Sequence, residues 1–368
     1  MDGSRGDPAD RRWMRRAIRL ARRSRPSPNP RVGAVVVRDG EAVGEGWHEA
    51  AGQPHAEVVA LSRAGEAARG ATLYVTLEPC CHTGRTGPCS EAVVRAGVSR
   101  VVAGCEDPNP AVAGGGLRRL RDAGIEVDCG VLEEEARELI AGHERFCRTG
   151  LPHVVWKFAM TLDGRIATSQ GRSRWISGEE SRRYVHRLRR DSDAVLVGIG
   201  TVLADDPSLT ARPPGSYPPP LRVVADSSAR TPLSARVLAG RDGRSVILTA
   251  EDAPPDRVEA LEAAGASVIR AGRGRVDLEK ALRELAERFG VRSLLLESGP
   301  CLASSMVRAG LVGDIVCFVA GKLFGGGPGP LGGLDVLDPA EAPRALIRKV
   351  RRFGPDVALF AKLDGACV

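Results

Sequence analysis

Three side chains able to bind a metal lie in the first half of the chain, at His55, Cys80 and Cys89. One imidazole and two thiolates suit Zn²⁺, which prefers tetrahedral coordination by nitrogen and sulfur. Structural zinc sites usually have four protein ligands, whereas three ligands leave a fourth position for water. Because bound zinc lowers the pKa of that water toward neutrality, the set predicts a catalytic centre that makes hydroxide at working pH.

A carboxylate stands beside these ligands, since Glu57 follows His55 by two residues. It can take a proton from water and deliver it to a departing amine. The order His-x-Glu and then Pro-Cys matches the signature of zinc deaminases, in which the two cysteines form Cys-x-x-Cys. Here residues 81–88 separate Cys80 from Cys89, and this longer loop contains His82 and Arg85. Both residue types suit a polar or phosphorylated substrate.

Strand-like and helix-like segments alternate around this motif, which indicates an α/β domain with a largely parallel sheet. Strands are expected at Val32–Arg38, Ala42–Trp47 (its hairpin partner), Thr72–Thr76, Arg100–Gly104 and Ile125–Asp128. Helices are expected at Ala56–Ala64, Ser90–Ala96, Leu117–Ala123 and Glu133–Cys147.

Residues 149–152 (Thr-Gly-Leu-Pro) interrupt this pattern, so we expect two domains, 1–148 and 152–368. Strands of the second are expected at Val154–Met160, Ala194–Gly198, Arg222–Ala225, Val246–Thr249, Ser293–Glu297, Asp314–Val319 and Val357–Ala361, and helices at Glu179–Arg190 and Leu278–Arg288. Gly299-Pro300 should open a further helix whose N-terminus can receive a phosphate. No GxGxxG motif follows a strand, so a Rossmann cofactor site is not indicated.

Composition narrows the classes of function. No apolar run approaches the ~18–20 residues of a membrane span, and no export signal is evident, so a cytoplasmic protein is expected. Nine cysteines, an odd number, do not suggest a disulfide framework. The net charge is +7, but residues 1–25 hold nine arginines against three aspartates. That segment is expected to form an amphipathic helix with a basic, solvated face, which weakens a nucleic-acid interpretation.

Beyond the zinc motif, segments over about residues 10–365 resemble the bacterial bifunctional deaminase/reductase of riboflavin biosynthesis. In the first half these are Ser27–Pro30, Val32–Val35, Gly44–His48, His55–Glu57, Thr76–Cys80 and Asp107–Pro110. In the second half they are Lys157, Leu162–Ala167, Ser173–Ser177, Val197-Gly198, Thr201–Pro207, Leu209-Thr210, Glu297–Pro300 and Gly321–Lys322. The resemblance implies a cytidine-deaminase-like α/β/α domain followed by a dihydrofolate-reductase-like α/β domain.

The same resemblance implies two reactions. The first is zinc-dependent hydrolytic deamination of 2,5-diamino-6-(5-phosphoribosylamino)pyrimidin-4(3H)-one, with one Zn²⁺ per deaminase domain. The second is reduction of the ribosyl group to ribityl by NADPH. The implied partners are a small phosphorylated pyrimidine and further copies of the chain in a homo-oligomer, with no nucleic acid and no membrane.

Residue roles follow from the matching positions. In the deaminase domain the resemblance implies zinc binding by His55, Cys80 and Cys89, proton transfer by Glu57, and substrate contacts by Asn29, His48, His82, Arg85, Asp107 and Asn109. In the reductase domain it implies substrate contacts by Ser173, Arg189, Leu209, Arg212 and Glu297. Cofactor contacts are implied for Ala159, Trp175, Thr201, Asp205, Ser227, Gly299, Pro300, Cys301, Leu302, Ala303, Ser304 and Ser305, with Asp205 also a catalytic group.

Three other interpretations stay open. A deaminase with an inactive reductase domain ranks second, because Ser298 and Cys301 differ from the residues common around this Gly-Pro pair. A nucleic-acid deaminase would explain the basic N-terminus but not the second α/β domain, and it should weaken steeply with salt. A zinc-stabilised scaffold would leave Glu57 without a role.

Overall fold

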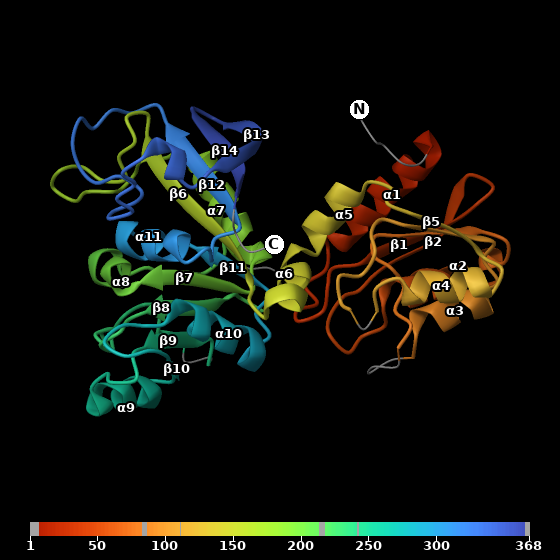
Figure 1. Ribbon diagram of the computed structural model, residues 1–368, viewed down its shortest axis with the longest axis horizontal. Helices are drawn as coiled ribbons and strands as arrows, with labels where there is room; N and C mark the ends of the chain where they lie inside the picture. Colours follow the sequence, from red (N-terminus) through yellow and green to blue (C-terminus); the bar gives the residue numbers. More distant parts are fainter. Residues whose placement is uncertain (1–6, 83–86, 111, 213–217, 241–242, 365–368) are drawn as a thin grey trace. The chain divides into compact units, whose positions relative to one another are not determined.

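The computed structural model describes residues 7–82, 87–110, 112–212, 218–240 and 243–364. The chain forms two compact units, Met1–Gly150 and Leu151–Val368 (Figure 1). Within the described ranges, no helix combines the length and the apolar character needed to span a membrane. The cysteines in these ranges are all free thiols.

A five-stranded sheet forms the centre of the first unit, in the order β2-β1-β3-β4-β5. Its strands are β1 (Gly33–Arg38), β2 (Glu41–Trp47), β3 (Thr72–Val75), β4 (Arg100–Ala103) and β5 (Glu126–Cys129). Strand β1 runs antiparallel to both β2 and β3, whereas β3, β4 and β5 are parallel. The sheet is therefore mixed rather than largely parallel, because the Asp39-Gly40 turn, with φ of 52° and 77°, reverses the chain directly after its first strand.

Helices cover both faces of this sheet, which gives the expected α/β/α layers (Figure 1). On one face α1 (Pro8–Ala21) packs Met14, Ala17 and Ile18 against the sheet. The other face carries α2 (Ala56–Ala64), the 3₁₀ turn η1 (Gly65–Ala68), α3 (Cys89–Ala96) and α4 (Gly115–Asp122). Gly33 lets α1 approach closely, since a Cβ there would lie 2.1 Å from the Ala17 carbonyl oxygen.

One helix expected from the sequence is two helices in the structure. The segment predicted as Glu133–Cys147 divides into α5 (Glu133–Leu139) and α6 (Ala141–Thr149). Ile140 between them leaves the helical region, with φ of −107° and ψ of 12°, and is almost fully buried in the core under α2–α4. Burial of this β-branched side chain at the break starts α6 in a new direction.

The second unit contains a nine-stranded sheet in the order β10-β9-β8-β7-β11-β6-β12-β14-β13. The seven strands from β10 to β12 are parallel, and β14 and β13 continue the sheet antiparallel. Their bounds are β6 (His153–Thr161), β7 (Ala194–Gly198), β8 (Leu221–Ala225), β9 (Ser245–Thr249), β10 (Ser267–Arg270), β11 (Ser293–Leu296), β12 (Asp314–Ala320), β13 (Ala345–Phe353) and β14 (Asp356–Leu363).

Helices again cover both faces. α7 (Glu179–Asp191), α8 (Ile199–Asp205) and α9 (Pro255–Ala263) lie on one face, and α10 (Leu278–Arg288) and α11 (Pro300–Arg308) lie on the other. A 3₁₀ turn, η2 (Pro339–Glu341), precedes β13. Strands β13 and β10 and helix α9 were not expected. Four basic residues in β13 interrupt the apolar pattern by which β-strands are recognised.

Candidate active site

The three predicted metal ligands come from three separate elements. His55 precedes α2, Cys80 follows β3, and Cys89 is the first residue of α3. Their ligand atoms lie within 4.8 Å of one another, and His55 Nδ1 is 3.1 Å from Cys89 Sγ and 3.7 Å from Cys80 Sγ. Ligands of a tetrahedral zinc ion lie roughly 3.5–3.8 Å apart, given the usual bond lengths. The 3.7 Å distance falls in this range and the 3.1 Å distance is shorter, so the donor set fits Zn²⁺ with a small movement of the His55 or Cys89 side chain.

Charge at this cluster favours a thiolate. The hydrogen bond between the thiols of Cys80 and Cys89 lowers the pKa of Cys80 to about 4 and raises the pKa of Cys89. The backbone N–H of Cys89 also donates to Cys80 Sγ at 3.3 Å. The lowered pKa of Cys80 favours the thiolate, which is the form that binds a metal, and metal binding would displace the remaining thiol proton.

Glu57 is buried beside the ligands, with 3% of its surface exposed. Burial raises the pKa of Glu57 to about 7, and the charge of His55 opposes this shift. A carboxyl group that titrates near neutrality can both accept and donate a proton at working pH.

A cavity of about 420 Å³ opens onto His55, Cys80 and Glu57. It is lined by the other predicted deaminase residues Asn29, His48, His82, Asp107 and Asn109, whereas Arg85 lies outside the described residues. Burial lowers the pKa of His48, so its ring is neutral: Nδ1 donates to the Pro54 carbonyl oxygen at 3.1 Å, and Nε2 accepts from the Asn29 amide at 3.0 Å.

Glu78 organises one wall of this cavity, a role that the sequence did not indicate. Its buried carboxylate accepts hydrogen bonds from the backbone N–H groups of Asp107 (3.1 Å), Gly114 (2.9 Å), Gly116 (2.8 Å) and Leu117 (3.2 Å). Charge-assisted bonds of this kind hold backbone firmly. Glu78 thereby ties the Asp107 loop to the N-terminus of α4.

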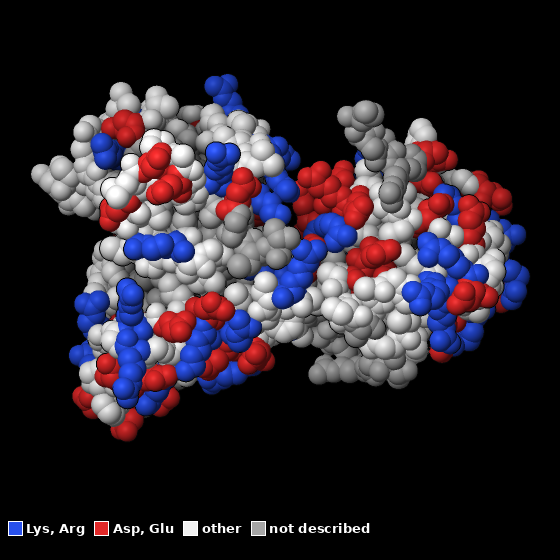
Figure 2. All heavy atoms as spheres, viewed as in Figure 1, with Lys and Arg blue, Asp and Glu red and all other residues white. Residues whose placement is uncertain are grey.

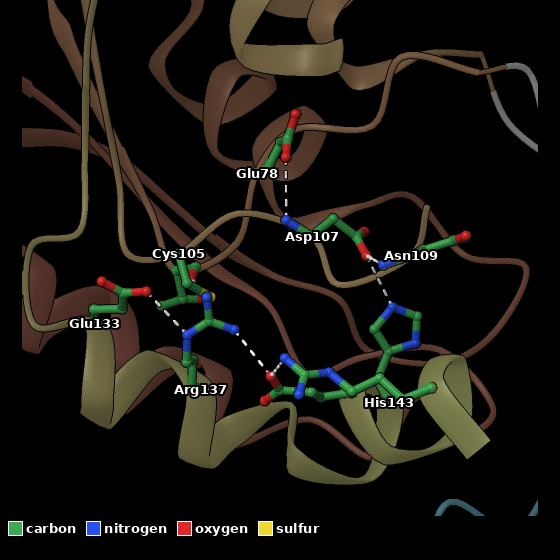
Figure 3. Close-up of polar contacts among 10 residues, drawn as sticks. Glu78, Cys105, Asp107, Asn109, Glu133, Arg137 and His143 are labelled. Carbon is green, nitrogen blue, oxygen red and sulfur yellow. Dashed lines mark hydrogen bonds and ion pairs between the residues drawn. The ribbon is translucent and has the colours of Figure 1, made fainter. Parts of the chain in front are cut away.

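His143 is the second unexpected residue of this wall. Figure 3 shows its ring pointing from α6 toward Asp107, with Nε2 3.1 Å from Asp107 Oδ1. The same oxygen accepts the backbone N–H of Asn109 at 2.9 Å. The sequence carried no signal for His143, because its helix was predicted without the break that redirects it.

The second unit gathers three charged groups around the carboxyl end of β11, where Glu297 follows the last residue of the strand. Arg189 of α7 bonds both carboxylate oxygens of Glu297, at 2.5 and 3.1 Å, and Lys157 Nζ of β6 lies 3.6 Å from the same carboxylate. Burial opposes ionisation, but Arg189 and Lys157 hold the pKa of Glu297 at about 2. Ligands of open parallel sheets bind at this edge. Lys157, a lysine within an apolar strand, had no predicted role.

Known proteins resemble the whole chain. A family model for the cytidine and deoxycytidylate deaminase zinc-binding region matches residues 8–105, and one for the RibD C-terminal domain matches residues 152–359. Riboflavin biosynthesis protein RibD of Aquifex aeolicus is 43% identical over 356 residues, covering 96% of this chain and 98% of the relative. The chain belongs to the RibD family. It is a bifunctional enzyme of riboflavin biosynthesis, with a zinc-binding deaminase domain and a reductase domain.

Solved structures of RibD proteins agree with this assignment. Acinetobacter baumannii RibD, form 1, matches with a TM-score of 0.86 and 38% identity, over 96% of this chain and 99% of that one. The diaminohydroxyphosphoribosylaminopyrimidine deaminase/5-amino-6-(5-phosphoribosylamino)uracil reductase of Thermotoga maritima matches with a TM-score of 0.85 and 36% identity, with the same coverage. The expected fold of both domains is confirmed.

Within the RibD reductase domain, the segment around Trp175 lies beside the end of α8. The Trp175 side chain is 63% exposed, and the Arg182 guanidinium lies 4.7 Å from its ring centroid. Arg174 is 3.4 Å from the Asp205 carboxylate and donates to the Asp205 carbonyl oxygen at 2.7 Å. These contacts bring the predicted residues Trp175 and Asp205 to one region. Of the other predicted site residues, Ser173, Ala159 and Thr201 are half-buried and Arg212 is exposed.

Several residues predicted to contact the substrate or the cofactor have side chains that are buried in the core or hydrogen-bonded to other parts of the domain. Leu209 and Ala303 are almost fully buried in two of the hydrophobic cores of this unit, and Ser304 Oγ accepts the backbone N–H of Gly332 at 2.9 Å. Ser227 Oγ accepts the backbone N–H of Val276 at 3.1 Å. At the start of α11, Gly299 is the N-cap, Pro300 and Leu302 are half-buried, and Cys301 and Ser305 are exposed.

Proposed function

We propose that the first domain deaminates 2,5-diamino-6-(5-phosphoribosylamino)pyrimidin-4(3H)-one and that the second reduces the ribosyl group of the product to ribityl with NADPH. The observation that carries the proposal is the 420 Å³ cavity that opens onto His55, Cys80 and Glu57. The Thermotoga maritima relative, whose name states both activities, supports the same substrates for this chain.

In the proposed deamination, zinc held by His55, Cys80 and Cys89 supplies a hydrolytic nucleophile from water at neutral pH. Glu57 takes the proton of the attacking water and delivers it to the departing amine, which leaves as ammonia. The Asn29–His48 pair and the Asp107–Asn109 loop, which line the cavity, orient the pyrimidine. His82 and Arg85 are proposed to contact the phosphate, because both residue types suit that group.

In the proposed reduction, NADPH supplies a hydride when bound. The residues around α11 fit its diphosphate, since the helix N-terminus at Gly299 offers backbone N–H groups. Next to it Ser298 Oγ is buried and makes no hydrogen bond within the described part of the chain. Trp175, Asp205 and exposed Cys301 are proposed to complete the cofactor site. Arg189 and Glu297 are proposed to hold the sugar phosphate, with Asp205 as the catalytic group.

The proposal includes a homo-oligomer that binds no nucleic acid. Leu346, Ile347 and Val350 of the edge strand β13 are 54–60% exposed, which supports burial against a second copy. Figure 2 shows Lys and Arg side chains interspersed with Asp and Glu over the visible surface of each unit, rather than gathered into one basic tract. A cytoplasmic location stays a prediction.

One assay tests the two activities together. The zinc-loaded full-length protein receives only the diaminopyrimidinone ribotide and NADPH, and ammonia and NADPH are measured in the same tube. Equal amounts of ammonia released and NADPH oxidised would support the proposal. Ammonia without NADPH oxidation would support the inactive-reductase alternative, and no ammonia would refute the proposed deamination.

A further inference from the structure

His143 lines the substrate cavity, yet neither the metal cluster nor the proton shuttle requires it. Its side chain is 15% exposed, and its Nε2 lies 3.1 Å from Asp107 Oδ1 (Figure 3). The thiol of Cys147, one turn farther along α6, lies 3.6–3.8 Å from the two ring nitrogens. The ring is therefore held between Asp107 and its own helix, where it lines the cavity.

Asp107 is fixed from two directions. Its backbone N–H donates to the Glu78 carboxylate, which fixes the position of the main chain. Its Oδ1 accepts hydrogen bonds from His143 Nε2 and from the Asn109 backbone N–H, which fixes the side-chain torsions of Asp107. Within the described residues, Oδ2 makes no hydrogen bond. This second oxygen is thus free to accept a hydrogen bond from a ligand in the cavity that Asp107 lines.

We infer that His143 is a positioning residue for deamination, which orients Asp107 so that Oδ2 accepts a hydrogen bond from an N–H or O–H of the substrate. The inference rests on the proposed function and adds a determinant of specificity to it. A pyrimidine that lacks the matching donor would leave Oδ2 of Asp107 desolvated and unpaired, and would therefore bind less well. His143 acts only through Asp107 and takes no part in the proton transfers of Glu57.

Steady-state ammonia release by the zinc-loaded full-length protein tests this role with two variants. His143→Phe keeps a flat ring but removes the donor, and KM should rise roughly tenfold with kcat changed less than about threefold, because the lost bond stabilises ground and transition states alike. His143→Gln places an amide N–H near the position of Nε2 and should keep KM within about threefold of wild type. Arg148→Gln, on the same helix, is the matched control.

A double-mutant cycle shows whether the effect passes through Asp107. In an Asp107→Ala background, His143→Phe should change KM no further. The positioning role would be refuted if His143→Phe left KM unchanged, or if it lowered kcat at constant KM. It would also be refuted if His143→Gln raised KM as much as His143→Phe does, or if His143→Phe raised KM by the same factor in the Asp107→Ala background. Zinc content and the reductase rate on deaminated substrate verify folding. Wild-type protein that releases no ammonia would instead refute the proposed function.

Discussion

At the scale of single residues, two carboxyl groups of this chain differ in the direction in which the protein shifts their pKa. Glu57 is buried with its pKa raised to about 7, whereas Glu297, whose side chain is 10% exposed, has its pKa lowered to about 2. The difference arises from neighbours: Glu297 faces Arg189 and Lys157, which favour its charged form. One carboxyl group is prepared to exchange a proton and the other to stay ionised.

Glu297 should make the reductase domain sensitive to acid. Its folded pKa of about 2 lies below the ordinary value of 4.5, so its stabilising effect is complete above about pH 4.5 and is lost as pH falls toward 2. Glu297→Gln should cost about 3 kcal/mol at pH 7, because it leaves two largely buried cations, Arg189 and Lys157, without their partner. Thermal unfolding from pH 7 to 2 measures both effects.

The control for that experiment is Glu284→Gln, which removes an ion pair with Arg288 within one helix. Such a pair contributes about 0.3–0.5 kcal/mol, so the variant should follow the wild-type pH dependence. If Glu297→Gln lost stability between pH 4.5 and 2 as steeply as wild type, the assigned charge state of Glu297 would be wrong.

The sequence predicted the residues expected to bind zinc and to transfer protons, but it did not predict the residues that hold the cavity wall in place. His55, Glu57, Cys80 and Cys89 follow the order of the zinc-deaminase signature, with ligand types typical of a zinc site but a longer spacing between the two cysteines. Glu78 and His143 act through contacts with Asp107, which is 29 and 36 residues away in the chain. Neither contact leaves a pattern in the sequence, because each depends on how the α4 and α6 segments pack in three dimensions.

At the scale of elements, the Asp107 loop and α4 depend on one carboxylate. Glu78→Gln should lower the free energy of unfolding of the first unit by about 1–3 kcal/mol, since an amide offers one acceptor oxygen to four backbone donors. Chemical denaturation measures the loss. The variant should also raise KM for the deaminase substrate, while zinc binding stays near wild type. A variant as stable as wild type would show that the loop holds its shape without this charge.

The sequence predicted helices and turns correctly where neighbouring residues along the chain determine them. The expected helix over residues 56–64 and the Asp39-Gly40 hairpin both form. The antiparallel pairing of β1 with β3 was not foreseen, because strand order depends on which neighbours bury each face. The break at Ile140 was also missed, since helical periodicity continues through it and only tertiary burial interrupts the backbone.

At the scale of the whole molecule, β13 leaves one edge of the nine-stranded sheet exposed. If a second copy covers it, Ile347→Glu together with Val350→Glu should shift the protein toward monomer in sedimentation-velocity experiments, because charges oppose burial of that strand. Leu233→Glu, at another exposed apolar position, is the control and should leave the distribution unchanged. A double variant that sediments as wild type would place any interface elsewhere.

The proposed deamination depends on Glu57 as the proton shuttle at a zinc site, and Glu57→Gln tests this role most directly. The substitution keeps the size of the side chain and all three metal ligands, so zinc content should equal that of wild type. Ammonia release should fall by about 10²–10⁴-fold, the usual contribution of general acid–base catalysis, while NADPH oxidation with pre-deaminated substrate continues at the wild-type rate. Ammonia release near the wild-type rate from the zinc-loaded variant would contradict the account.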